Sequence, residues 1–244
     1  MATGIGGYDL LAQHYDALMQ GVPYWRWAEF ISKLARGIGA ERIVDVGCGT
    51  GTVALALAKK GFAVFGIDES VEMLAMARNK ALAANLSVTW LQNNFWGVQL
   101  PCNIIISTCD GVNHLLKVRD VLRFFHHAYT NLERGGLLIF DINSPYKFEH
   151  TLAGETFYCR HPNLDIIWVN EYIAPINWAN IILYEGRNGN YEKSSFEIIE
   201  RCYESSTLLY YLRKCGFQRV SLWNNYQGRL RSAKASRITL VAQK

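Results

Sequence analysis

Residues 42–68 decide the fold, and they read R-I-V-D-V-G-C-G-T-G-T-V-A-L-A-L-A-K-K-G-F-A-V-F-G-I-D. The apolar side chains of Ile43, Val44 and Val46 are typical of a buried parallel strand. Glycines follow this strand, and residues 53–60 are rich in Ala and Leu, which favours a helix. Residues 63–67 predict a second strand that ends at an acid, residue 68. Together these elements form a βαβ unit that can hold a nucleoside.

The alternation of helices and strands continues on both sides of this unit. Further helices are predicted at residues 8–19, 24–36, 70–84 and 115–132. Further strands are predicted at residues 86–91, 104–107 and 137–143. Ser70 is suited to cap the third of these helices, and Gly135 and Gly136 are expected to break the fourth. Continuous apolar strands separated by helices indicate a parallel sheet that helices cover on both faces.

The pattern of apolar and polar residues changes after Pro145, which itself predicts a strand-to-helix turn. Between residues 155 and 203 apolar and polar residues alternate, which is typical of an antiparallel sheet. Residues 205–215 then predict a helix capped by a serine, and residues 217–223 and 238–242 predict two last strands. We therefore divide the chain into a nucleoside-binding domain (1–150 and 205–244), which begins with helices within residues 1–38, and an antiparallel insertion (151–204).

Composition narrows the class of protein. Half of the 244 residues are apolar, 19% are charged and the net charge is +4, so charge alone does not indicate a nucleic-acid or membrane partner. We expect no secretory signal and no membrane-spanning run. The six cysteines are scattered without a C-x-x-C pair, so we expect no metal site and no disulfide framework. Free thiols indicate the cytoplasm.

The glycine turn distinguishes between nucleotide ligands. The dinucleotide fingerprint G-x-G-x-x-G/A needs a small third residue, but that position is Thr52. The glycines fall instead as G-x-G-x-G, with Asp45 two residues before the first of them. A buried acid beside the turn suits a cationic ligand such as S-adenosylmethionine (SAM) better than a pyrophosphate. The alternative is that the glycines only make a tight turn; Asp68, placed to accept from ribose hydroxyls, argues against it.

At this point the sequence resembles the class I SAM-dependent methyltransferases, and within them the YqeM-like bacterial branch. The resemblance covers nearly the whole chain. It rests on the glycine motif at 45–51, C-D-G-V-N-H-L-L at 109–116, F-D-I-N-S-P-Y-K-F at 140–148, short matches at 15–16 and 23–24, and the closing stretch from 189–191 through 216–217. It implies a Rossmann-like α/β fold, a seven-stranded mostly parallel sheet with helices on both faces and an antiparallel last strand, plus the antiparallel β insertion. It also implies that residues 1–38 form a helical lid and that the insertion (151–204) covers the substrate or contacts another subunit.

The resemblance also implies which residues bind SAM. The glycine turn would lie against the methionine part, Asp68 against the ribose, and the end of the third strand against adenine. Many members carry an acid at that last place, whereas this chain has Asn94; an Asn side chain can still accept and donate there. The expected cofactor-binding residues are Tyr15, Tyr24, Asp45, Gly47, Cys48, Gly49, Gly51, Asp68, Glu69, Met73, Asn93, Asn94, Phe95, Cys109, Asp110 and Asn113. Phe95 and Trp96 either wall the adenine or are core aromatics.

Fewer residues point to the methyl acceptor. His114 is a candidate base, or else it orders its loop. Tyr15, the second catalytic candidate, and Tyr24 come from the lid, where a hydroxyl could hold the SAM carboxylate or simply pack. Candidate substrate contacts in the insertion, which could equally be ordinary sheet residues, are Trp168, Glu171, Tyr172 and Arg187. Residues 226–237 carry four basic residues, which form either an anion-binding patch or a solvated loop.

The expected activity is methyl transfer by in-line displacement, with S-adenosylhomocysteine as product. SAM carries its own leaving group, so positioning of donor and acceptor supplies much of the rate. We expect a small-molecule acceptor and a monomer or homodimer. The alternatives are an RNA or protein acceptor, for which nucleic-acid binding has weak support, or a SAM-binding module without transferase activity.

Overall fold

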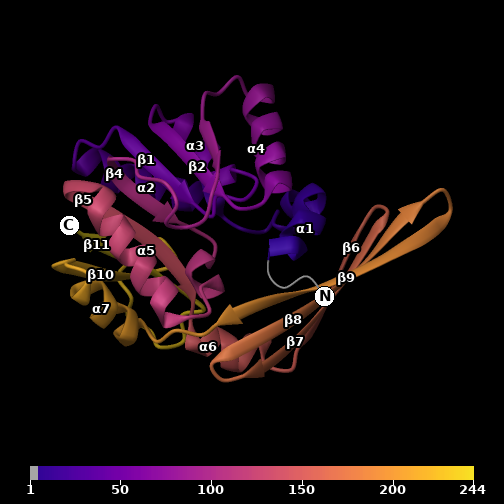
Figure 1. Ribbon diagram of the computed structural model, residues 1–244. Coiled ribbons are helices and arrows are strands. Elements are labelled where there is room, and N and C mark those ends of the chain that lie inside the picture. Colours follow the sequence, from indigo (N-terminus) through magenta and orange to yellow (C-terminus); the bar gives the residue numbers. More distant parts are fainter. Residues whose placement is uncertain (1–4) are drawn as a thin grey trace.

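A computed structural model describes residues 5–244, apart from the side chains of Ile5 and Arg187. Its largest element is a seven-stranded sheet of order β10-β11-β5-β4-β1-β2-β3 (Figure 1). The neighbouring pairs from β5 to β3 are parallel, and β11 runs antiparallel to both β5 and β10. This order is the one expected of the Rossmann-like fold, so the predicted fold class is confirmed.

The elements have the following bounds. The helices are α1 (Ile5–Leu18), α2 (Tyr24–Gly37), α3 (Thr52–Ala58), α4 (Val71–Ala83), α5 (Val118–Asn131), α6 (Pro145–Lys147) and α7 (Ser205–Lys214), with short turns η1 (Gly111–His114) and η2 (Phe148–Leu152). The strands of the large sheet are β1 (Arg42–Val46), β2 (Ala63–Asp68), β3 (Thr89–Gln92), β4 (Cys102–Ser107), β5 (Leu132–Asn143), β10 (Arg219–Asn224) and β11 (Arg237–Gln243).

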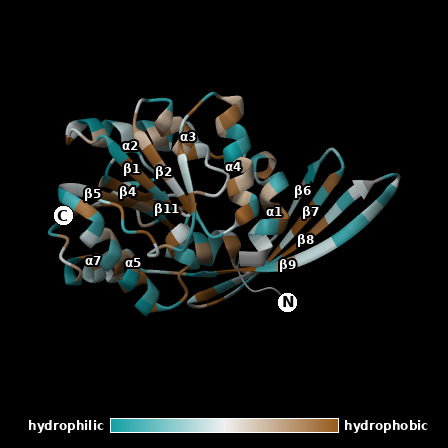
Figure 2. Cartoon of the chain, turned by 45° about the horizontal axis from the view of Figure 1, so that its top comes forward, coloured by the Kyte–Doolittle hydropathy of each residue, from teal (hydrophilic) through white to brown (hydrophobic). Residues whose placement is uncertain are grey.

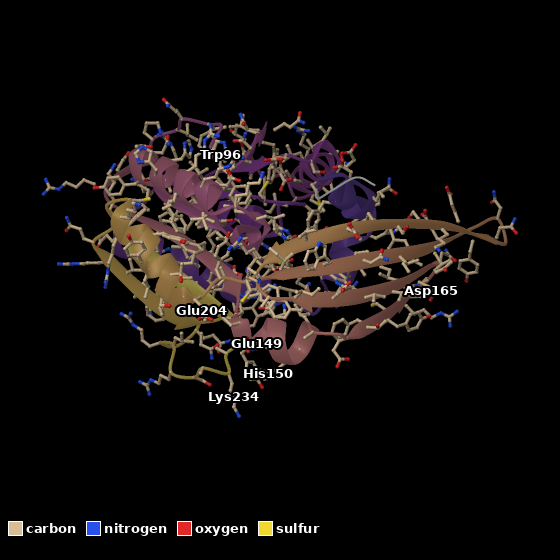
Figure 3. The ribbon with its side chains drawn as sticks, turned by 60° about the horizontal axis from the view of Figure 1, so that its bottom comes forward. Trp96, Glu149, His150, Asp165, Glu204 and Lys234 are labelled. Atoms are coloured by element: carbon tan, nitrogen blue, oxygen red, sulfur yellow. The ribbon has the colours of Figure 1, made fainter. Side chains whose placement is uncertain are left out.

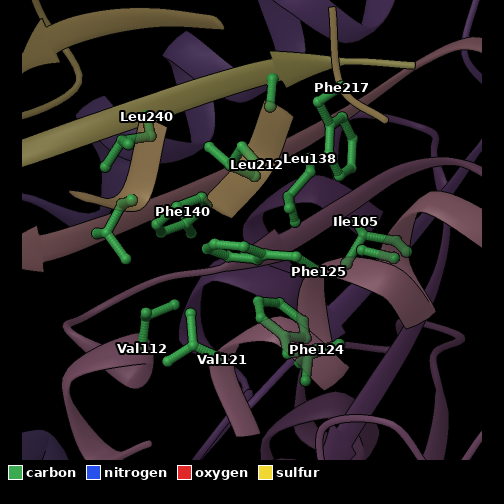
Figure 4. Close-up of a cluster of buried hydrophobic side chains, with 14 of the residues drawn as sticks. Ile105, Val112, Val121, Phe124, Phe125, Leu138, Phe140, Leu212, Phe217 and Leu240 are labelled. Carbon is green, nitrogen blue, oxygen red and sulfur yellow. The ribbon is translucent and has the colours of Figure 1, made fainter. Parts of the chain in front are cut away.

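Two apolar layers hold helices against the two faces of the sheet. One layer joins α2 and α3 to the sheet through side chains such as Trp27 and Leu57. The other joins α5 and α7 through Phe125 and Leu212, which meet Phe140 of β5 (Figure 4). Figure 2 shows the hydrophobic strands lying between these helices. The strands are apolar throughout because both of their faces are buried.

Several boundaries differ from the sequence prediction, and three of them have a clear local cause. The third strand begins at Thr89, where its pairing with β2 begins. The fifth helix begins at Val118, because residues 111–114 form a 3-10 turn first. Strand β5 begins at Leu132, so the two glycines lie inside a strand. Gly135 has φ +82°, and the register of β5 on β4 shifts beside it; the glycines therefore form a bulge.

A second, antiparallel sheet leaves the body after α6. Its strands, in spatial order, are β6 (Thr156–His161), β7 (Leu164–Ile173), β8 (Ile176–Arg187) and β9 (Asn190–Arg201). It extends sideways from the large sheet, with α1 between the two (Figure 1). A third apolar cluster, which includes Leu11 of α1 and Phe196 of β9, fastens its root. Within residues 5–244, no helix is long and apolar enough to cross a membrane.

Replacing Phe125 by Ala should lower the free energy of unfolding by about 3–5 kcal/mol, because the ring is fully buried and its loss leaves a cavity. The ring lies 5.3 Å from that of Phe140 and 5.8 Å from that of Phe124, between centroids. Denaturant unfolding measures the change. The matched control is Tyr210→Ala, an aromatic that is 62% exposed on α7, which should change stability by less than about 0.5 kcal/mol. Equal losses in both variants would contradict this placement of the core.

Candidate functional site

A cavity of about 460 Å³ lies at the carboxyl ends of β1 to β4, where open α/β sheets bind ligands. The sequence-predicted residues that line it are Tyr15, Gly47, Gly49, Asp68, Glu69, Met73, Asn93, Phe95, Cys109 and His114, and Trp96 lines it too. The remaining lining residues were not predicted; they are Tyr8, Ser70, Thr108, Gly111, Leu115, Leu116, Lys117, Asp120, Ile198 and Ile199. The cavity therefore draws on the large sheet, on α1 and on the last strand of the insertion.

The three glycines of the turn after β1 differ in the reason why a side chain would not be tolerated there. All have positive φ, at +69° for Gly47, +53° for Gly49 and +75° for Gly51. A Cβ on Gly49 would point into open space, with no protein atom within 4 Å, and this residue lines the cavity. A Cβ on Gly51 would instead lie 2.5 Å from Cη2 of Trp90. Gly51 is thus needed for close packing, and Gly49 leaves room for a ligand.

Asp68 ties the glycine turn to the start of α4. Its Oδ2 accepts from the backbone N–H of Gly49 at 2.7 Å, and its Oδ1 accepts from that of Ser70 at 3.0 Å. Burial raises the pKa of Asp68, while these backbone donors act in the opposite direction. A carboxylate offers about four acceptor positions, so further lone pairs remain for hydroxyl donors in the cavity.

Asp45 lies below the turn and is 1% exposed. Neither of its carboxylate oxygens has a hydrogen-bond partner among the residues that the structure describes. Burial, with a smaller contribution from the charge of Asp68, raises the pKa of Asp45 to about 8. A buried carboxylate without a partner is costly unless a cation is brought near it. The site is therefore suited to a ligand that carries positive charge.

A fully buried acid on β5, Asp141, shapes the turn after β4. Its carboxylate accepts from the backbone N–H groups of Cys109 at 2.8 Å and Asp110 at 3.0 Å, and from the hydroxyl of Tyr226. It also pairs with Arg237. Both turn residues have a left-handed backbone, with φ near 60°. The turn directs the thiol of residue 109 into the cavity.

Hydroxyl groups from the N-terminal helices meet this turn. The hydroxyls of Tyr15 and Tyr24 lie 3.8 Å and 3.9 Å from Sγ of Cys109. Burial raises the pKa of this thiol well above its ordinary value, so it stays neutral. Tyr8, which the sequence did not single out, places its hydroxyl 3.0 Å from Nε2 of His114. The cavity thus has a polar end built from tyrosine, thiol and imidazole groups.

Seven predicted residues do not line the cavity and instead support its walls. Besides Asp45, Gly51 and Tyr24, they are Cys48, Asn94, Asp110 and Asn113. Cys48 is half-buried beside Gly66, and the side chain of Asn94 accepts from the backbone N–H of Trp96 at 3.1 Å. Asp110 lies 3.5 Å from Arg237; burial acts to raise its pKa, but Arg237 and Lys147 hold it well below the usual range. Asn113 donates to the carbonyl of Arg201 at 2.8 Å.

The substrate contacts expected in the insertion lie away from the cavity. Trp168 packs on the third apolar cluster, Tyr172 stacks on Phe148, and Glu171 is exposed. The side chain of Arg187 is outside the described residues. Figure 3 shows Asp165 far out along the insertion, distant from Trp96 on the body, and only the root of the sheet approaches the site.

The basic run near the C-terminus separates into two parts. Cζ of Arg229 lies over the ring of Trp223, 4.4 Å from its centroid, whereas the side chain of Arg237 is only 14% exposed and pairs with Asp141 and Asp110. The interpretation of the whole segment as a solvated loop or a basic patch was therefore wrong for Arg237. Its two acid partners lie far away in sequence, so only the fold could reveal this role.

Comparison with known proteins places this geometry in a family. A family model for a methyltransferase domain matches residues 43–136. A protein of Geobacillus sp. (strain WCH70), classed as a methyltransferase, is 33% identical, and the match covers 97% of this chain and 99% of that protein. YqeM of Bacillus subtilis (strain 168), in the same class, is 29% identical with 97% of both chains covered. These matches confirm the resemblance that the motifs indicated.

Solved structures agree on the fold. A SAM-dependent methyltransferase from Clostridium acetobutylicum ATCC 824 has a TM-score of 0.87 and 24% identity, with 97% of this chain and 98% of that chain covered. CalS10, an amino pentose methyltransferase from Micromonospora echinaspora solved with SAM bound, has a TM-score of 0.75 and 16% identity, with coverage of 94% and 96%. The seven-stranded sheet and the insertion are therefore shared as one arrangement.

Asp45→Asn should raise the free energy of unfolding of the ligand-free chain at pH 8, by more than about 1 kcal/mol. The pKa of Asp45 rises from 3.8 to about 8 on folding, so between these values the folded state binds the proton more tightly than the unfolded state. The contribution of this group to stability therefore falls as pH rises from about 4 to 8. Asn has no such titration, and the advantage of the variant should grow across that interval.

Urea unfolding at pH 5, 6, 7 and 8 measures the effect. The control is Glu41→Gln, which removes a carboxylate at an exposed position before β1 and is unfolded under the same conditions. A difference between Asp45→Asn and the wild type that stays constant from pH 5 to 8 would show that residue 45 is not a strained buried acid.

Proposed function

We propose a small-molecule acceptor for this chain, which belongs to the class I SAM-dependent methyltransferases and takes its methyl group from SAM. The observation that carries the proposal is the cavity of about 460 Å³, a size typical of small-molecule sites. Residues from α1 and β9, such as Tyr8 and Ile198, wall it on the side away from the sheet. The net charge of +4 gives an RNA acceptor little support.

We propose that the donor half of the cavity is formed by the glycine turn, Asp68 and the loop after β3. Asp68 would accept from the ribose hydroxyls, and Asn93 and Phe95 would contact adenine. Gly47 and Gly49 would lie against the methionine part. Two features of the protein fit this ligand: the open space beside Gly49, and the buried Asp45 carboxylate without a partner, which a sulfonium or ammonium nearby would stabilise.

The polar end of the cavity is proposed as the acceptor half. SAM supplies a methyl group bonded to a sulfonium, which is a good leaving group. The protein then has to align the acceptor atom with that methyl group and exclude water, and such alignment can supply much of the rate. Tyr15, Cys109 and His114 surround this end. We assign positioning of the acceptor to Tyr15 and acceptance of its proton to His114, since the neutral thiol is a poor base.

Entry to the cavity requires movement of α1 in this proposal. Polar contacts fasten the helix over the site: Asp16 pairs with Lys80 at 2.6 Å and accepts from Thr50 at 2.6 Å, and Asp9 accepts from Ser70. Exposed or half-exposed ion pairs contribute only about 0–1 kcal/mol each, so they can break and reform during turnover. Residues 1–38 would thus act as a lid, and the root of the insertion as a fixed cover.

Two narrower points complete the proposal. CalS10 is named for an amino pentose acceptor, which supports a nitrogen nucleophile as one acceptor class to test first. The cytoplasm is the proposed compartment, in keeping with six free cysteines.

Asp68→Ala should weaken SAM binding by at least about 100-fold, because two hydrogen bonds to a charged acceptor are each worth about 1.5–3 kcal/mol when buried. Isothermal titration calorimetry measures the affinity, and circular dichroism checks that the variant folds. The control is Glu72→Ala, an exposed acid in the first turn of α4, which should bind within about twofold of the wild type. A folded Asp68→Ala variant with unchanged affinity would refute the ribose assignment.

A labelled-methyl assay tests the acceptor class. The chain is incubated with methyl-labelled SAM and a cell extract divided into metabolite, RNA and protein fractions. We expect label in the metabolite fraction, in an amount that falls strongly in His114→Asn. Label in RNA or protein alone would contradict the small-molecule proposal, and SAM binding without any transfer would indicate a non-catalytic module.

A further inference from the structure

The insertion ends inside the active site, where its last strand holds the loop that carries His114. Asn113 donates to the carbonyl of Arg201, and the Arg201 side chain donates to the carbonyl of Leu116 at 3.0 Å. The Tyr203 hydroxyl donates to the carbonyl of Leu115. Residues on both sides of His114 are therefore fixed to the end of β9, so the position of the imidazole depends on the insertion.

The same strand brings a buried acid to this place. Glu200 is 6% exposed, and its Oε1 accepts from Nδ2 of Asn143 at 2.9 Å. The same amide nitrogen donates to Oδ2 of Asp110 at 2.6 Å. The other atom of this amide, Oδ1 of Asn143, accepts from Nζ of Lys147 at 2.8 Å. Asp110 has Arg237 as its cation, whereas Glu200 has no ion pair within the described part of the chain.

Glu200 also lies within electrostatic reach of the two groups at the polar end of the cavity. Burial and the nearby Asp110 raise its pKa, and the charges of His114 and Lys147 act in the opposite direction. Tyr8, hydrogen-bonded to His114, has its pKa raised by burial, then by Asp110, then by Glu200. Three elements, α1, η1 and β9, thus bring Tyr8, His114 and Glu200 together.

We propose that Glu200 is a positioning residue for methyl transfer, whose carboxylate stabilises the proton that His114 takes from the acceptor. The inference rests on the proposed function of this cavity. The titratable groups that act on or contact His114 are Tyr8 from α1, Asp110 from the preceding turn and Glu200 from β9. Asp110 shares Arg237 with Asp141, whereas Glu200 has no cation of its own among the described residues, so we assign the balance of a new positive charge to Glu200.

The step balances in atoms and charge. The acceptor atom forms a bond to the methyl carbon, the carbon–sulfur bond breaks, and its electron pair stays on sulfur. The acceptor proton passes to Nε2 of His114, directly or through the Tyr8 hydroxyl. Positive charge therefore moves from sulfur to the imidazole. Away from bulk water this charge is costly without an opposite charge near it, and we assign that charge to the Glu200 carboxylate, which interacts electrostatically with His114.

Nuclear magnetic resonance of ¹⁵N-labelled histidine rings tests this role without any methyl acceptor. The chain has six histidines, and His114→Asn identifies the signals of residue 114. Glu200→Gln keeps an oxygen that can accept from Asn143 but removes the charge. At a fixed pH it should lower the ratio of protonated to neutral His114 at least about tenfold. Glu200→Asp should restore most of the ratio.

The matched control is Glu197→Gln, on the opposite face of the same strand, which should leave the ratio unchanged within about twofold. A Glu200→Gln ratio equal to that of the wild type in a folded variant would overturn the proposal and leave Glu200 a structural residue. If that variant does not fold, the wild-type chain decides: the carboxyl carbon of Glu200, observed by ¹³C labelling, and the His114 ring should respond over one shared pH interval. Independent responses would overturn the proposal.

Calorimetry separates this inference from the proposed function. Glu200→Gln should bind SAM within about twofold of the wild type, because Glu200 does not line the donor half. Failure of the wild type to bind SAM would refute the function of the cavity whatever the histidine signals show. Normal SAM binding together with an unchanged His114 ratio would refute only the role of Glu200.

Discussion

The polar end of the cavity depends on one buried carboxylate, that of Asp141. This carboxylate accepts hydrogen bonds from two backbone N–H groups of the turn after β4 and from the Tyr226 hydroxyl, and it pairs with the Arg237 guanidinium. The turn residues Cys109 and Asp110 have positive φ, a conformation that costs free energy unless its surroundings impose it. Asp141 imposes it from β5, while Arg237 of β11 balances the negative charge. The antiparallel last strand of the sheet therefore takes part in shaping the site.

The two halves of the cavity are built in different ways. The proposed donor half comes largely from one continuous βαβ unit, in which Asp68 joins the glycine turn to the next helix, with the loop after β3 added to it. The proposed acceptor half comes from α1, η1, β9 and the turn after β4, which are far apart in sequence and meet only in the folded chain. A role for Glu200 would make the insertion part of the chemistry as well as a cover.

The features that could be predicted from the sequence are those that depend on residues close together in the chain. Apolar strands, the Ser70 cap and the acid at the end of β2 were found because each follows from its neighbours in the chain; the cap accepts from Met73 at 3.0 Å. Features that depend on distant partners were not found. Sequence alone predicts that the glycine pair 135–136 breaks a helix, whereas in the structure the pair lies in β5 beside β4. Sequence alone also places Arg237 in a basic loop, whereas in the structure it pairs with Asp141. Tyr8 and Glu200 lie in ordinary helix and strand patterns, with no local signal of their roles.

The most direct test of the account is a crystal structure of the chain with S-adenosylhomocysteine. The account predicts that both ribose hydroxyls bond to the Asp68 carboxylate and that the methionine part crosses the open space beside Gly49. It also predicts that the sulfur faces the end of the cavity bounded by Tyr15, Cys109 and His114. A ligand bound with its ribose away from Asp68, or with its sulfur turned away from His114, would contradict the division of the cavity into donor and acceptor halves.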